Sequence, residues 1–175
     1  MLILAAIPFY LFACIASANA ARKVRQFGGP ARDRFAWAAL AAFFGFMIAV
    51  RLLDGENVMR DMLRVLLDAG EIYRGRRGFQ GAAIALLGLV FAVLTAWVLR
   101  EKAARQNAAS RSLCVAKLAG LAYLALFAAR LISLHQIDAL LYGGAHINRA
   151  VDPGLALLVG WMAIRFVREL KSRQR

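Results

Sequence analysis

The 175-residue sequence contains only two cysteines, two histidines and three prolines, and this scarcity limits its chemistry. Cys14 and Cys114 lie in separate apolar stretches, so they form neither a disulfide framework nor a zinc-binding spacing. A Gly-rich phosphate loop and the HExxH, GxSxG and CxxC motifs are also absent. We therefore expect no bound metal and no cofactor.

A net charge of +13 would favour nucleic acid as the partner of a soluble domain, but here the basic residues sit in short connections between apolar blocks. No polar segment is long enough to house a nucleic-acid-binding module. We expect membrane lipids, rather than nucleic acid, to be the partner of the charged residues, because basic loops beside apolar blocks are topology signals.

Apolar residues make up 62% of the chain and form blocks of nearly spanning length. A bilayer core about 30 Å thick takes roughly 20 helical residues to cross. The sequence predicts one all-α membrane domain over residues 1–175, a polytopic helical bundle with about five spans at 2–19, 35–53, 81–99, 113–134 and 153–167. Asp152 is expected to cap the last span, with Pro153 at its first helical position.

The distribution of basic residues predicts the orientation of these spans. Fourteen lie in connections on one side of a five-span chain, against six on the other side. The richer side should be cytoplasmic, which puts the N-terminus outside and the C-terminus inside a bacterial inner membrane. Ala18-Asn19-Ala20 resembles a signal-peptidase site, but basic residues follow the first block rather than precede it, so we expect this block to be retained.

Residues 57–74, between the second and third spans, have helical periodicity. Apolar residues such as Val58, Met59 and Met62 share one face, and Asp61 and Asp68 occupy the other. This pattern predicts an amphipathic helix on the outer membrane surface.

Small residues recur at every fourth position, for example Ala41 with Gly45 and Gly88 with Ala92 and Ala96. Such faces let helices approach closely in lipid. A self-contained bundle is the favoured use of these faces, and docking of a second copy or another membrane subunit is the alternative. Trp37 and Trp97, near the cytoplasmic ends of their spans, are expected to be interfacial anchors.

Polar residues concentrate at the outer ends of the spans. They are Tyr73, Arg76, Arg77 and Gln80 before the third span, Arg130, Ser133, His135 and Asp138 at the end of the fourth, and Arg51 at the end of the second. The arginines, with Tyr73 and Gln80, are candidates for binding a lipid phosphate or another anion.

Three interpretations of this outer cluster remain open. His135 can be a general base oriented by Asp138, with Ser133 a candidate nucleophile by proximity alone. His135 or His146 can instead contact a haem or quinone head group. The third interpretation is a structural polar network that holds the outer helix ends together.

The motifs Tyr73-x-x-Arg76-Arg77-x-x-Gln80 and Arg130-x-x-Ser133-x-His135-x-x-Asp138 resemble a pattern in uncharacterised small polytopic inner-membrane proteins of proteobacteria. The resemblance covers about the middle two thirds of the chain, and Ile72 stands where those proteins often carry Trp. It implies a multi-pass topology and a polar cluster, without an activity.

Two functional hypotheses follow from the sequence. The first is a non-catalytic accessory or scaffold subunit of an inner-membrane assembly. The second is a lipid-active enzyme, or a lipid- or quinone-binding protein, with its site at the periplasmic leaflet. A cavity into which the outer side chains converge would favour the second hypothesis, and polar pairs closed on one another would favour the first.

Overall fold

The chain is all-α in the computed structural model, which describes residues 6–55, 58, 59, 61, 62, 65, 76–103, 108–132 and 147–172. Within these residues there are five long helices and no strand. The helices are α1 (Ile7–Gln26), α2 (Ala31–Leu52), α4 (Arg76–Ala103), α5 (Ala108–Ile132) and α7 (Ile147–Ser172).

The turn between α1 and α2 follows from local sequence. Gly28 adopts a positive φ of 64°, which glycine tolerates without a steric penalty, and the Gly29 N–H donates to the Val24 carbonyl oxygen at 2.8 Å. Pro30 then precedes the first residue of α2. These residues reverse the chain within a few positions, so α2 runs back along α1.

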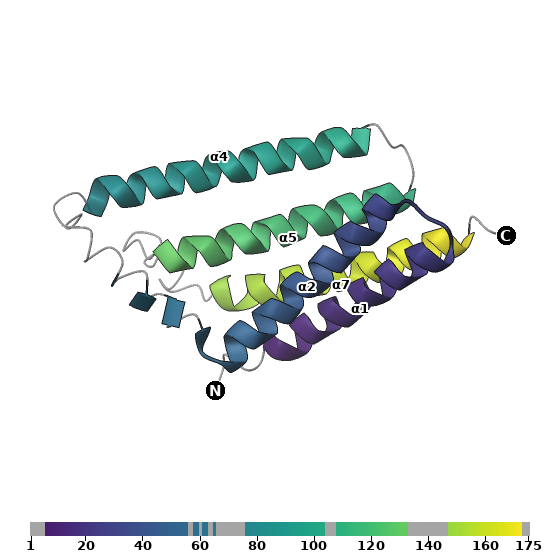
Figure 1. The fold of residues 1–175 in the computed structure, drawn as a ribbon, viewed down its shortest axis with the longest axis horizontal. Coiled ribbons are helices and arrows are strands. Elements are labelled where there is room, and N and C mark those ends of the chain that lie inside the picture. Colours follow the sequence, from purple (N-terminus) through teal and green to yellow (C-terminus); the bar gives the residue numbers. More distant parts are fainter. Residues whose placement is uncertain are drawn as a thin grey trace.

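The helices form a bundle with α4 at its edge (Figure 1). Helix α1 packs against α2 and α7, and α5 packs against α7 on one side and α4 on the other. Helix α2 touches α5 more sparingly. Among the described helices, α4 therefore makes its main contact with one neighbour, α5.

The core combines large buried aromatic side chains with small residues at close approaches between helices. Trp37 and Phe166 are fully buried and pack with ring centroids 5.2 Å apart. A Cβ at Gly160 would collide with the ring of Phe12, and one at Gly120 would lie 2.7 Å from Leu40 Cδ2. Glycine at these two positions lets α7 approach α1 and lets α5 approach α2.

Each predicted apolar block overlaps one of the five helices, and the blocks at 81–99 and 153–167 lie wholly within α4 and α7. Every described helix extends beyond its block at one end or both. By length and composition, two segments among the described residues can cross a membrane, Ala31–Leu52 and Ala109–Ala129. The helical content is thus confirmed, and a bundle of five spans stays a prediction. The predicted surface helix at 57–74 lies largely outside the described residues.

Two sequence expectations are wrong. Helix α7 begins at Ile147, so Asp152 does not cap it and Pro153 lies inside it. The side chain of Asp152 faces the other helices instead, where it meets Tyr10 and Arg51. Trp37 is not an interfacial anchor, because it is fully buried against Phe166 in the core.

Candidate functional site

Four helices meet in a buried polar network where α2 ends and α7 begins. The Arg51 Nη2 donates to Asp152 Oδ2 at 3.2 Å, and the Tyr10 hydroxyl donates to the same oxygen at 3.5 Å. The Tyr123 hydroxyl donates to the Tyr10 hydroxyl at 2.7 Å. We call these four residues the Arg51–Asp152 network. It joins α1, α2, α5 and α7 through one carboxylate oxygen.

The network is closed rather than open to a ligand. The side chains of Arg51 and Asp152 are 12% and 8% exposed, and Tyr10 and Tyr123 are buried. The two tyrosine rings also pack edge to face, with centroids 5.7 Å apart. A buried carboxylate is costly unless it is paired, and a buried tyrosine hydroxyl usually requires a hydrogen-bond partner. The arrangement meets both requirements and ties the helix ends together.

A second charged cluster lies at the opposite end of the bundle. The Arg32 Nη2 donates to Glu101 Oε1 at 2.7 Å, and the Lys117 Nζ donates to Glu101 Oε2 at 2.8 Å. Trp97 adds cation–π contacts, with its ring 5.9 Å from the Arg32 guanidinium carbon and 5.6 Å from Lys117 Nζ. We call these four residues the Glu101 cluster. It links α2, α4 and α5.

The Glu101 cluster contains two cationic side chains and one carboxylate. Burial acts to raise the pKa of Glu101, but hydrogen bonds from Arg32 and Lys117 outweigh it, so the pKa is held below its ordinary value near 4.5. Two cations share this one carboxylate, and the Arg32 side chain is half exposed. The cluster therefore presents excess positive charge at this end of the bundle.

The same end also carries a link between α5 and α7. The Ser112 hydroxyl donates to Glu169 Oε2 at 2.9 Å, and the Arg165 Nε donates to Glu169 Oε1 at 2.9 Å. These contacts bring the start of α5 beside the end of α7, as the Glu101 cluster brings the start of α2 beside the end of α4. The basic residues at the end of α1 and the start of α2 and the C-terminal residues of α7 thus gather at one end.

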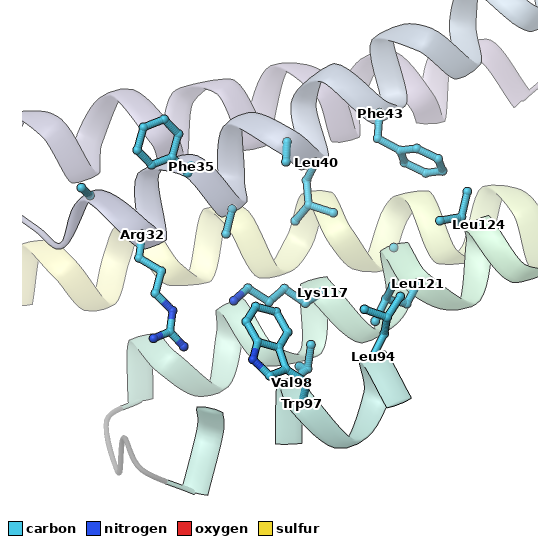
Figure 2. Close-up of a pocket in the computed structure, with 14 residues that line it drawn as sticks. Arg32, Phe35, Leu40, Phe43, Leu94, Trp97, Val98, Lys117, Leu121 and Leu124 are labelled. Atoms are coloured by element: carbon cyan, nitrogen blue, oxygen red, sulfur yellow. The ribbon is translucent and has the colours of Figure 1, made fainter. Parts of the chain in front are cut away.

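An apolar groove of about 720 Å³ runs from the Glu101 cluster between α2 and α4, with α5 at its base (Figure 2). Arg32 reaches from α2 toward Trp97 and Lys117 at one end of the groove. Phe43 and Leu124 lie at the other end. Its lining residues are Ala31, Arg32, Phe35, Ala36, Ala39, Leu40 and Phe43 of α2, Leu94, Trp97 and Val98 of α4, and Lys117, Gly120, Leu121 and Leu124 of α5.

Of the site residues predicted from sequence, Arg51 has a described side chain, and it lies in the Arg51–Asp152 network. Four others belong to helices whose backbone alone is described at those positions, namely Arg76, Arg77, Gln80 and Arg130. The remaining four lie outside the described residues, namely Tyr73, Ser133, His135 and Asp138. Convergence of these side chains on a lipid or catalytic site stays a prediction.

Sequence reasoning missed three members of the Arg51–Asp152 network. Tyr10 and Tyr123 could have been found from the sequence, because each places a hydroxyl in the middle of an apolar block, where that hydroxyl needs a hydrogen-bond partner. Asp152 was assigned to a helix cap, although it is also the acid nearest the outer end of the last span.

The Glu101 cluster and the groove were missed as well. Lys117 is a cation one turn inside an apolar block, and such a residue calls for a nearby carboxylate. Glu101, just past the third block, was that carboxylate.

Within the described part of the chain, no group of three or more His, Cys, Asp or Glu side chains is arranged to hold a metal ion. Comparison with known proteins gave no match, whether to a protein-family model, to a curated protein or to a solved structure.

Proposed function

We propose that the chain is a multi-pass protein of a bacterial inner membrane that serves as a non-catalytic accessory subunit, with α4 as the helix that contacts the rest of the assembly. Three features support this proposal: the apolar outer surface, the closed Arg51–Asp152 network and the small-residue face of α4.

Membrane insertion is supported by what the helices expose midway along their length. Each of the five helices carries at least one large apolar side chain that is more than two-fifths exposed, such as Ile15 at 60%, Phe46 at 51%, Leu89 at 62%, Leu124 at 44% and Trp161 at 59%. The charged side chains of Arg51 and Asp152 are turned inward. An apolar surface around buried charged side chains suits a lipid solvent, whereas large exposed apolar patches are rare on soluble monomers.

The orientation follows from charge. The Glu101 cluster shares one end of the bundle with the basic residues at the end of α1, the start of α2 and the end of α7, and the positive-inside rule favours the cytoplasm for that end. The Arg51–Asp152 network then lies toward the periplasm. A reporter fused after residue 175 should be active in the cytoplasm, and activity in the periplasm would refute this orientation.

The observation that carries the accessory role is an unused packing face on α4. In α2, Ala41 and Gly45 face α1, where Cys14 Sγ donates to the Ala41 carbonyl oxygen at 3.3 Å. In α5, Ala116 is fully buried and Gly120 packs against Leu40. These four small residues thus pack inside the bundle, whereas Ala42 and Ala49 of α2 are exposed.

Helix α4 differs. Leu87, Phe91, Leu94 and Val98 are its more buried residues and form the stripe that faces the bundle. At 3.6 residues per turn, Gly88, Ala92 and Ala96 form a separate face centred roughly 130° around the helix from this stripe, and all three are exposed. A Cβ at Gly88 would meet nothing within 4 Å. Since small residues are what lets helices associate in lipid, this face is suited to a further transmembrane helix.

The enzyme hypothesis gains less support. Arg51, its candidate anion-stabilising residue with a described side chain, is engaged with Asp152 in a buried ion pair. The general base, orienting and nucleophile candidates, His135, Asp138 and Ser133, lie outside the described residues. The closed pair at the outer end is the arrangement expected of a structural network.

Site-specific photo-crosslinking in native membranes tests the docking role of α4. A photoreactive residue at Ala92 should give one discrete adduct, and the same residue at Ala38, exposed on α2, should give none. Gly88→Leu should abolish the Ala92 adduct without changing the thermal stability of the purified protein, because the added side chain meets open space. Coexpression of two differently tagged copies separates self-association from another subunit.

The proposal fails if Ala92 gives no adduct and gentle extraction yields a monomer without a stoichiometric companion. It also fails if adducts form equally from Ala92 and Ala38, because that pattern indicates collision rather than docking.

A further inference from the structure

We infer that the groove between α2, α4 and α5 is a binding site for an anionic phospholipid of the cytoplasmic leaflet, with the phosphate at Arg32 and an acyl chain along the groove. This inference rests on the proposed membrane insertion and orientation. It is independent of the docking role of α4, because it uses a different face of that helix.

The length of the groove matches one leaflet. Its α2 wall runs from Ala31 to Phe43, which are twelve helical steps apart, and at 1.5 Å per step this is about 18 Å. Half of a bilayer core about 30 Å thick is roughly 15 Å. The groove therefore extends from the interface to about the middle of the membrane, as an acyl chain does.

The groove holds about 720 Å³. A slender, flexible chain fits this space without separating α2 from α4. The lining is suited to such a chain, because apart from Arg32 and Lys117 it consists of glycine and apolar side chains, including Phe35, Leu40 and Leu121.

The charge at the mouth of the groove selects an anionic head group. Arg32 and Lys117 share the carboxylate of Glu101, so the four residues of the cluster carry one surplus positive charge, and the adjacent Asp33 also attracts Arg32. The guanidinium of Arg32 carries five N–H donors, and its side chain is half exposed. Trp97 holds both cations against its ring. A phosphate at this position receives N–H donors and also neutralises the surplus charge.

Trp97 lines the groove and provides the readout. The purified full chain is reconstituted into vesicles that contain phosphatidylglycerol or phosphatidylcholine brominated on the acyl chains, and quenching of tryptophan fluorescence is measured. Subtracting the quenching of Trp97→Phe isolates the contribution of Trp97 from those of Trp37 and Trp161. We expect brominated phosphatidylglycerol to quench Trp97 at a several-fold lower mole fraction than brominated phosphatidylcholine.

Two variants and their matched controls test the mechanism. Arg32→Gln leaves the Lys117–Glu101 pair in place and should reduce the preference for phosphatidylglycerol about fivefold, since a cation near an anionic lipid contributes about 1 kcal/mol. Arg111→Gln, an exposed position of α5 that does not line the groove, should leave the preference unchanged.

The second pair tests the groove itself. Ala39→Leu fills the groove and should weaken quenching by both brominated lipids, whereas Ala38→Leu, at the adjacent exposed position outside the lining, should not.

Equal quenching by the two lipids, or an equal effect of Arg32→Gln and Arg111→Gln, overturns the inference. So does a loss of quenching in Ala38→Leu as large as in Ala39→Leu. Extraction with alkaline carbonate is run in parallel: release of the chain from the membrane refutes the proposed insertion, while retention with unselective quenching refutes the lipid site alone.

Discussion

Removing one charge of the Arg51–Asp152 network should destabilise the bundle far more than removing both. At 3.2 Å and an effective dielectric constant of 20, the gross Coulomb attraction is roughly 5 kcal/mol. Desolvation of the two groups offsets much of this attraction. A partner left alone, however, keeps its desolvation cost without compensation.

We expect Arg51→Met and Asp152→Leu each to lower the free energy of unfolding by about 3 kcal/mol. This value is at the low end of the range for buried pairs, because the Arg51 side chain is 12% exposed at a helix end and can reach interfacial water. The double variant should lose only about 1–2 kcal/mol, because it buries no unpaired charge.

The measurement is reversible unfolding in mixed micelles, followed by circular dichroism, with the double-mutant cycle giving the coupling energy. Arg165→Met is the control, because that side chain is 59% exposed and its pair with Glu169 should contribute at most about 0.5 kcal/mol. The assignment of this network as the link between four helices would be refuted if the losses in free energy of unfolding for Arg51→Met and Asp152→Leu were strictly additive and each were no larger than the loss for Arg165→Met.

Three further predictions concern single contacts. Tyr10→Phe removes two hydrogen bonds and should lower the free energy of unfolding by about 1–3 kcal/mol, whereas Tyr123→Phe removes one and should lower it by about 0.5–1.5 kcal/mol. A larger loss for Tyr123→Phe than for Tyr10→Phe in the same unfolding assay would contradict the geometry. Gly160→Ala forces a clash with a core ring and should cost about 1–3 kcal/mol, while Gly88→Ala at an open position should be neutral or stabilising. The folded-state pKa of Glu101 is lowered, so the ionised carboxylate stabilises the fold fully above about pH 4.5, and this contribution is lost as pH falls through the lowered pKa. The difference in melting temperature between wild type and Glu101→Gln should therefore vanish in acid. A difference that instead grows below pH 4 would reverse the sign of this interaction.

Hydropathy predicts where these helices lie but not where they end. Each of the five apolar blocks overlaps a helix, yet Ala31–Arg34 and Arg100–Ala103 are helical too, although they are too polar to register as spans. Helix formation requires backbone hydrogen bonds and tolerates charge, so a helix continues past the apolar stretch that identifies it. The same limitation explains Asp152, whose position beside Pro153 resembles a helix start while the helix begins five residues earlier.

The partners of polar side chains are harder to predict because they depend on which helices become neighbours. Arg51 is recognisable from sequence as a charge that needs a carboxylate. Its partner Asp152 is 101 residues away, and Tyr10 is 142 residues from the same carboxylate. No periodicity within one helix specifies such pairs. The groove is a property of the gap between α2 and α4 and has no signature in either helix alone.

The two proposed interactions divide α4 between its faces, and this division separates them experimentally. The lipid groove uses Leu94 and Trp97, and the docking face uses Gly88 and Ala92, which lie on a different side of α4. Gly88→Leu should therefore abolish the crosslink while leaving Trp97 quenching unchanged, and Arg32→Gln should do the opposite. If either variant disturbs both readouts, lipid occupancy and partner docking are coupled through the packing of α4 on α5 and its contacts with α2.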